Sequence, residues 1–188
     1  MTANDRRTAI LNAILQLLAD AGLDGVTHRA VDKAAGLPQG STTYYFPKKA
    51  DLLVAAADHL ATLLAKDCDE LQIGFADRVA KQDIDAAIDY VGEELTIYAA
   101  TARHLFLARM ELTLAAARRP ELTGAGERLN AAARKPIAFF LTLIAADRSA
   151  DQIDTCAGLI DGITLMHVTG QGPKPTLAQV RAVFDAVL

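Results

Sequence analysis

The segment from Val26 to Leu53 constrains the fold more than any other part of the chain, because it contains two short helical patterns separated by a glycine. The first pattern predicts a helix over about 27–35, with a threonine as N-cap and Gly36 at its C-terminal end. The second begins after Pro38, which suits the start of a helix, and closes at Phe46. Two helices joined through a glycine turn form a helix-turn-helix.

The second of these helices is polar but almost uncharged. It carries amide, hydroxyl and phenol groups, from Gln39, Ser41, Thr42, Thr43, Tyr44 and Tyr45. Such groups suit hydrogen bonds to base edges and phosphate oxygens, whereas a solvent-facing helix usually carries Lys and Glu. Core packing is the alternative for the aromatic residues, and we expect it for Phe46 but a surface position for Tyr44 and Tyr45. The pattern favours contact with nucleic acid.

The distribution of charge agrees with this interpretation, although the formal net charge of the chain is −4. Residues 1–50 contain six basic and four acidic side chains, a balance of +2. That leaves 13 of the 19 basic and 19 of the 23 acidic side chains for residues 51–188, a balance of −6. We therefore expect the N-terminal end to meet phosphate and the acidic remainder to avoid it.

The remaining chain predicts an all-α fold, since apolar residues recur at helical spacing and no β-type alternation stands out. We expect helices over about 6–21, 48–73, 83–101, 102–118, 150–169 and 176–188, a polar connection over 76–82, and a further helix after Gly126 in which Pro136 causes a kink or an early break. No apolar run is long enough for a membrane span. Cys68 and Cys156 are 88 positions apart and are expected as buried thiols in a reducing cytosol.

Specific residues in this segment resemble the N-terminal domain of TetR-type transcriptional regulators over about residues 6–55. The matching positions are Thr27-His28-Arg29-Ala30-Val31, Ala35-Gly36-Leu37, Gly40-Ser41, Tyr45-Phe46-Pro47, Lys49 and Leu52-Leu53. One position departs from the pattern, because Thr43 stands where many members carry the first tyrosine of the recognition helix. The resemblance implies a three-helix DNA-binding domain over residues 1–47, joined by a long helix to a C-terminal helical domain over 48–188 for effector binding and dimerisation.

The expected DNA-binding residues follow from the two short helices and from the resemblance, which places Lys49 on the DNA backbone. They are Thr27, His28, Arg29, Gln39, Gly40, Ser41, Thr42, Thr43, Tyr44, Tyr45 and Lys49. The expected partner is a palindromic double-stranded DNA operator, which two copies of a short helix-turn-helix contact at half-sites about one DNA turn apart.

A second copy of the chain is therefore expected, and the last two helices are the candidates for the dimer interface. Small residues at spacing four and an apolar C-terminal stripe support this assignment, and they comprise Gly158, Gly162, Leu165, Val180, Val183, Phe184 and Val187. Packing of that stripe in the core of the same chain is the alternative. The resemblance implies a dimeric four-helix bundle.

Polar residues on otherwise apolar helices are candidates for an effector pocket, which the resemblance also implies. With nearby aromatic and methionine side chains they comprise Glu94, Tyr98, His104, Phe106, Arg109, Met110, Phe139, Phe140, Met166 and His167. For each polar residue alone, a satisfied hydrogen bond or exposure is the simpler explanation. The effector's identity does not follow from the sequence.

Catalysis is not expected, because the chain contains no HExxH, no phosphate-binding glycine loop, and only four histidines in separate helices. We expect no metal and no cofactor. The hypothesis is a cytoplasmic, homodimeric, ligand-responsive transcriptional regulator. The resemblance implies a repressor, because proteins of this type are most often repressors. The alternatives are a DNA-binding regulator without an effector, or a helical interaction module whose helix-turn-helix only packs.

Overall fold

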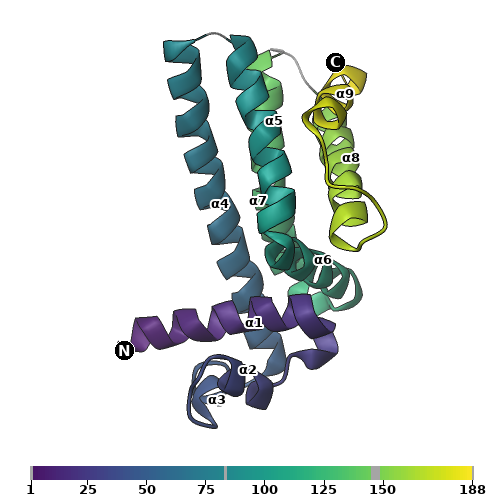
Figure 1. Cartoon of the computed structure of the whole chain (residues 1–188). Coiled ribbons are helices and arrows are strands. Elements are labelled where there is room, and N and C mark those ends of the chain that lie inside the picture. Colours follow the sequence, from purple (N-terminus) through teal and green to yellow (C-terminus); the bar gives the residue numbers. More distant parts are fainter. Residues whose placement is uncertain (1, 83, 145–148, 188) are drawn as a thin grey trace. The chain divides into compact units, whose positions relative to one another are not determined.

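The computed structural model describes residues 2–82, 84–144 and 149–187, and every regular element within these ranges is helical (Figure 1). The elements are α1 (Ala3–Gly25), α2 (His28–Ala34), α3 (Ser41–Tyr45), α4 (Lys49–Lys81), α5 (Ile84–Thr101), α6 (Arg103–Arg118), the short 3-10 helix η1 (Pro120–Leu122), α7 (Thr123–Ile144), α8 (Ala150–Val168) and α9 (Leu177–Val187). The all-α prediction is confirmed. None of the described helices is both long enough and apolar enough to cross a membrane.

The helices divide into two compact units. The first unit combines Met1–Leu63 with His104–Ala132, and the second combines Leu64–Arg103 with Ala133–Leu188. Both α4 and α7 contribute residues to each unit. These packing units do not coincide with the predicted domains, which meet between residues 47 and 48. The predicted boundary divides the chain by function and not by packing, and it stays a prediction.

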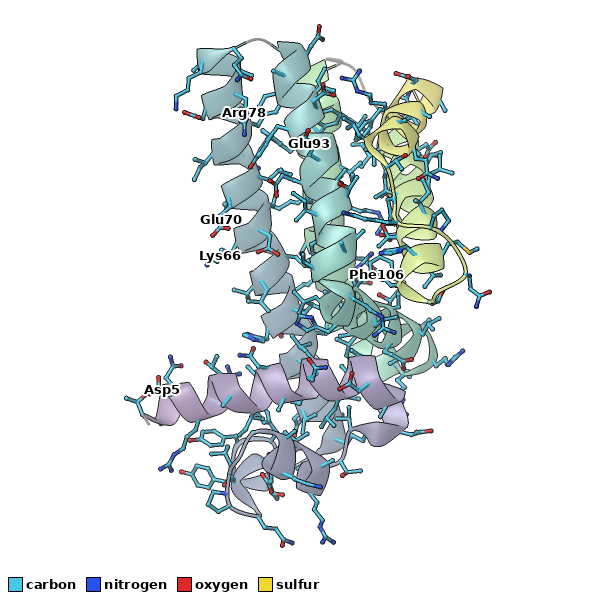
Figure 2. All side chains as sticks on the ribbon, viewed as in Figure 1. Asp5, Lys66, Glu70, Arg78, Glu93 and Phe106 are labelled. Atoms are coloured by element: carbon cyan, nitrogen blue, oxygen red, sulfur yellow. The ribbon has the colours of Figure 1, made fainter. Side chains whose placement is uncertain are left out.

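Helix α1 begins and ends as its sequence indicates. A capping box joins Thr2 and Asp5, each accepting a hydrogen bond from the other's backbone N–H, and Asp5 is labelled in Figure 2. Near the C-terminal end, Gly22 interrupts the helix with φ 63° and ψ −168°, a conformation that is essentially restricted to glycine. The predicted end at Gly22 is therefore confirmed as a break, after which a further helical turn runs to Gly25.

Helix α2 packs against both α1 and α3, as Figure 1 shows. Thr27 caps α2 by accepting a hydrogen bond from the backbone N–H of Ala30 at 3.1 Å, as predicted. Helix α3 is shorter than the sequence indicated, because Pro38 and Gln39 remain outside it. Phe46 follows α3 and is only 5% exposed, which confirms its predicted place in the core.

Helix α4 corrects a prediction, because it continues through Gly74 and through the segment 76–82 that was expected to be a connection. The glycine is required for packing: a Cβ at Gly74 would lie 2.1 Å from the Tyr90 hydroxyl. Phe75 is buried beside it, and the Arg78 guanidinium lies 5.1 Å from the centre of the Tyr90 ring. Gly74 therefore allows a close contact with α5 and does not end α4.

The second unit has a hydrophobic core to which α4, α5, α7, α8 and α9 all contribute. Helix α9 packs against α5 and α8, and its apolar stripe joins this core through Val180, Val183, Phe184 and Val187. The rings of Phe140 and Phe184 lie 4.3 Å apart. Assignment of these four α9 residues to the dimer interface is thus corrected, because their side chains are already buried within their own chain.

The other boundaries lie close to those expected. Helix α7 runs through Pro136 without ending, and it starts before Gly124 rather than after Gly126. Helix α8 begins with a capping box between Ser149 and Gln152. The predicted helix ends at Asp83 and Leu188 lie outside the described residues.

Candidate nucleic-acid interface

The helix-turn-helix is held together by a buried carboxylate. Asp32 of α2 is 3% exposed, and it accepts hydrogen bonds from the backbone N–H groups of Gly40 and Thr42, both at 2.7 Å, and from the Thr42 hydroxyl at 2.6 Å. Gly40 is the N-cap residue of α3, with φ 93°, and it has no side chain to cap the helix. Asp32 therefore satisfies, from the neighbouring helix, N–H groups that α3 leaves unpaired at its start.

These contacts also set the charge of Asp32. Burial by itself raises the pKa of the carboxyl group, but the hydrogen bonds from Thr42 and Gly40, together with the attraction of His28, outweigh it and hold the pKa below the ordinary value of 3.8. The carboxylate is therefore ionised at neutral pH. A negative charge at this end of α3 is favourable, because the exposed N–H groups make a helix N-terminus positive.

The opposite end of α3 is held by a second residue of α2. His28 lies one helical turn before Asp32, and its Nε2 atom is 2.7 Å from the carbonyl oxygen of Phe46, the C-cap residue of α3. A carbonyl oxygen can only accept, so Nε2 carries the proton and donates. The two ends of α3 thus meet an acceptor and a donor that belong to the same helix.

The outer side of the motif exposes most of the predicted DNA-binding groups. The exposed members are Thr27, Arg29, Gln39, Gly40, Thr43 and Tyr44. Tyr44 is 82% exposed, which confirms its predicted surface position. Tyr45 is half-buried, lies edge-on to Tyr44 at 5.2 Å, and donates a hydrogen bond to the carbonyl oxygen of Ala3 at 3.4 Å.

Other predicted DNA-binding groups are already engaged within the protein. Thr42 was expected on the DNA-facing side, but its side chain is fully buried and donates to Asp32, which corrects that assignment. The Ser41 hydroxyl donates to the carbonyl oxygen of Pro38 at 2.6 Å. Among the predicted residues of the two short helices, His28 and Thr42 therefore hold the motif together from inside.

Lys49, the first residue of α4, is half-buried and donates from Nζ to the carbonyl oxygen of Leu23 at 2.8 Å. The backbone N–H of Leu23 donates to Oε2 of Glu111 in α6 at 3.2 Å. Both backbone groups of Leu23 are thus paired with side chains from other helices of the first unit. The expected contact between Lys49 and a DNA phosphate stays a proposal. For this contact, Nζ must either bind the phosphate in addition to the Leu23 carbonyl oxygen or give up that hydrogen bond.

Two family profiles match the chain in this arrangement. A profile described as "Bacterial regulatory proteins, tetR family" covers residues 10–56, which include α2 and α3. A second, "Tetracyclin repressor-like, C-terminal domain", covers residues 82–188, more than half of the chain. The chain belongs to the TetR family of transcriptional regulators. The resemblance noted from the sequence is thereby confirmed.

Solved structures agree with the assignment of this TetR-family protein. The multidrug binding protein EbrR, complexed with ethidium, is similar over 100% of both chains, with 25% identity and a TM-score of 0.71. EbrR complexed with malachite green is similar over 98% of both chains, with 25% identity and a TM-score of 0.69. A TetR-family member from Streptomyces coelicolor A3 shares the fold at 24% identity, with 98% of each chain covered and a TM-score of 0.70. No curated protein matches.

The predicted effector residues of this TetR-family protein are divided between the two units. His104, Phe106, Arg109 and Met110 belong to the first unit, and Glu94, Tyr98, Phe139, Phe140, Met166 and His167 belong to the second. Arg109 is 7% exposed, and its guanidinium lies 4.9 Å from the centre of the Phe106 ring, a residue labelled in Figure 2. Phe140 is buried in the core of the second unit, whereas Met166 is 49% exposed. The predicted effector pocket stays a prediction.

The predicted dimer residues also separate into two groups. The α9 residues are buried in the chain's own core, but Gly158, Gly162 and Leu165 are exposed on α8. A Cβ placed at either glycine would meet no atom within 4 Å. Leu159 and Met166 complete an exposed, mainly apolar face of α8 at helical spacing, and we name these five residues the α8 face.

Sequence reasoning missed Asp32 as part of the interface. Its position contained one indication, since an acidic residue follows the buried Val31 and lies one helical turn after His28. A charged residue beside a buried apolar one indicates either a helix edge or a paired carboxylate. Only the geometry identifies its partners as the N–H groups of another helix.

Proposed function

We propose that this TetR-family protein is a transcriptional repressor that binds a palindromic operator as a homodimer and is released by a small-molecule effector. It acts in the cytoplasm, where the operator DNA is available. The observation that carries the proposal is the exposed polar surface of α2 and α3, on a helix-turn-helix that buries Val31, Asp32 and Thr42 on its inner side. A helix-turn-helix that served only for packing would not leave a tyrosine 82% exposed beside exposed glutamine, threonine and arginine side chains.

The α8 face supports the dimer. It is apolar and contains two glycines with open space above them, so a second helix could approach closely. Because α9 is occupied within its own chain, we assign the main contact to α8 in both copies, related by a twofold axis. Such an axis also presents two copies of α3 to successive half-sites.

An aromatic cation is the first effector class to test. EbrR, which is similar to this chain along its whole length, is named as a multidrug binding protein in complex with ethidium, an aromatic cation. The second unit places acidic and aromatic groups together: burial raises the pKa of Tyr90 and the neighbouring Glu94 carboxylate raises it further, while the Arg78 guanidinium, 5.1 Å from the ring centre, lowers it and shows that this ring accepts a cation. Carboxylates and aromatic faces both attract cations.

The DNA-binding part of the proposal can be tested by selection from a random double-stranded library with the purified protein. The expected result is an enriched sequence with twofold symmetry, bound more tightly than a scrambled duplex of equal length at a fixed salt concentration. Failure of a folded dimer to enrich any sequence would favour the helical interaction module instead.

The effector part is tested by adding ethidium or malachite green to the complex with the selected duplex. We expect release of DNA, measured by fluorescence anisotropy of labelled DNA, with a coupling free energy of about 1–3 kcal/mol. A parallel titration with a duplex-only control separates dye binding to DNA from dye binding to the protein. Specific DNA binding that no tested ligand changes would favour a regulator without an effector.

A further inference from the structure

We infer that His28 and Asp32 of α2 act as a two-ended clamp that positions the recognition helix α3, and that Thr42 is the residue through which the clamp holds its N-terminal end. The inference rests on the proposed function, because it concerns how α3 contacts DNA. It reassigns His28 and Thr42 from DNA contact to positioning of the groups that make contact.

Helix α3 cannot hold its own conformation. It has five residues, from Ser41 to Tyr45, and its N-cap is a glycine without a capping side chain. Isolated helices shorter than about 12 residues are marginal in water even when their sequence favours helix. Four of its five residues are threonine or tyrosine (Thr42, Thr43, Tyr44 and Tyr45), which have low helix propensity.

The clamp matches the polarity of α3 at both ends. Asp32 places a carboxylate at the N-terminal end, where it accepts three hydrogen bonds from Gly40 and Thr42 at 2.6–2.7 Å. His28 places an N–H donor at the C-terminal end, 2.7 Å from the Phe46 carbonyl oxygen. A negative group at the start of a helix and a donor at its end both favour the helical dipole.

The two clamp residues lie four positions apart on one face of a single helix. Residues at i and i+4 lie one above the other on a helix, so the separation of His28 and Asp32 is fixed by α2 itself. Because α2 also packs on α1, the clamp transfers the rigidity of a 23-residue helix to a five-residue helix. The exposed Gln39, Thr43 and Tyr44 then meet DNA in one arrangement.

The consequence for DNA binding is quantitative. If α3 forms in only a fraction of molecules, the apparent affinity for a specific site falls by that fraction. Non-specific binding depends on basic side chains and phosphates, and it does not require the register of α3. Loss of the clamp should therefore reduce discrimination between sequences more than it reduces attraction to DNA in general.

The experiment compares Thr42→Val, Thr42→Ser, Asp32→Asn and His28→Ala with the wild-type protein. Affinity is measured for the duplex selected by the wild type and for a scrambled duplex of equal length. Thr42→Val keeps the shape of the side chain but removes the hydroxyl, and we expect it to weaken binding to the selected duplex about tenfold, the value of one hydrogen bond to a charged group. Thr42→Ser restores the donor and should return affinity to within about threefold of wild type.

The other two variants remove one end of the clamp each. Asp32→Asn leaves N–H groups facing an amide, and we expect a loss of about tenfold to a hundredfold on the selected duplex. His28→Ala should cost about fivefold, the value of one neutral hydrogen bond. For all clamp variants, affinity for the scrambled duplex should stay within about threefold of wild type at equal salt.

Two matched controls are available in the first unit. Thr62→Val makes the same chemical change at an exposed position of α4, and Asp20→Asn makes the same charge change at an exposed position of α1. Both should bind the selected duplex as the wild type does, which separates the effect of the clamp from the loss of a hydroxyl in general and from the loss of one negative charge. Circular dichroism melting confirms that each variant is folded.

Three results would overturn the inference. Thr42→Val and Asp32→Asn binding the selected duplex with wild-type affinity would show that the clamp does not position α3. Equal losses on the selected and scrambled duplexes would show that these residues serve only overall folding. A failure of Thr42→Ser to restore affinity would assign the loss to shape and not to the hydroxyl. If the wild type selects no sequence, the proposed function fails and the inference fails with it, whereas the first three results leave wild-type binding intact.

Discussion

Replacement of Gly22 by alanine should destabilise the protein through the backbone and not through crowding. Gly22 has φ 63° and ψ −168°, in a region that an L-residue with a Cβ occupies only at a cost of about 1–3 kcal/mol. The new Cβ would lie 3.4 Å from Oε1 of Glu111, which is an ordinary contact. Steric clash therefore contributes little, and backbone strain is the main cause of the expected loss of stability.

The expected magnitude is a difference between two effects. Alanine also restricts the unfolded chain, which stabilises the folded state by about 0.4–1 kcal/mol. The net loss at Gly22 should thus be about 1–2 kcal/mol. For a chain of 188 residues this corresponds to a decrease in Tm of about 2–8 °C, at roughly 2–4 °C for each kcal/mol.

Thermal unfolding followed by circular dichroism measures this decrease, with Gly124→Ala as the matched control. Gly124 is exposed in the first turn of α7, its φ is not positive, and a Cβ there would lie 3.5 Å from Nη1 of Arg128. Alanine is the better helix former, so the control should be neutral or more stable by up to about 1 kcal/mol. A Gly22→Ala protein that unfolds at or above the wild-type temperature would contradict the reasoning.

Three further outcomes follow from exposure and burial. Tyr44→Ala should weaken binding to the selected duplex about fivefold, as loss of one hydrogen bond would, while Tm stays unchanged because the side chain is 82% exposed; wild-type affinity would remove Tyr44 from the DNA contact. Leu165→Glu should convert the dimer to a monomer in sedimentation experiments, because two symmetry-related charges would be buried without partners, whereas Leu114→Glu, at a 51% exposed position of α6, should remain dimeric. Burial raises the pKa of Cys156 to about 11 and also raises that of Cys68, so at pH 8 roughly one Cys156 thiol in a thousand is ionised. Neither cysteine should react with a thiol-specific disulfide reagent until the protein is unfolded in urea. Rapid labelling of the folded protein would contradict their burial.

The helices were predictable from sequence where local chemistry decides the outcome. Thr27 supplies an N-cap and Gly22 a left-handed break, and both depend on neighbours within a few residues. The same is true of Phe46, whose burial follows from an apolar ring beside Pro47 at the end of a polar helix. Local patterns therefore gave most element boundaries of the helix-turn-helix.

Glycines outside the helix-turn-helix have roles that depend on residues far away in sequence, which local patterns do not show. Gly74 was expected to end a helix, but it makes room for Tyr90. A Cβ at Gly92 would lie 2.3 Å from Cδ1 of Leu177, so this glycine allows α9 to approach α5. By contrast, Gly158 and Gly162 have the spacing of a packing motif, but a Cβ at either position would meet no atom of the same chain within 4 Å.

The apolar stripe of α9 illustrates a general limit of periodicity. A stripe shows that a helix buries one face, but it does not show which surface covers it. Here the core of the same chain covers it, and the α8 face is the apolar surface left over. The choice between these partners depends on tertiary contacts that no local pattern contains.

A single copy of the helix-turn-helix exposes few groups that can discriminate between DNA sequences. With Thr42 and His28 engaged inside the motif, the exposed side chains with polar groups suited to base edges are mainly Arg29, Gln39, Thr43 and Tyr44. At about 1.5 kcal/mol each they would supply about 6 kcal/mol, or roughly 10⁴-fold discrimination. Competing genomic sites number about 10⁶ or more, so one copy would be insufficient. Two copies joined through the α8 face would square this factor to roughly 10⁸. A recognition helix this short therefore depends on the dimer for selectivity, and discrimination by Leu165→Glu should fall from roughly 10⁸-fold to roughly 10⁴-fold even though its own helix-turn-helix is intact.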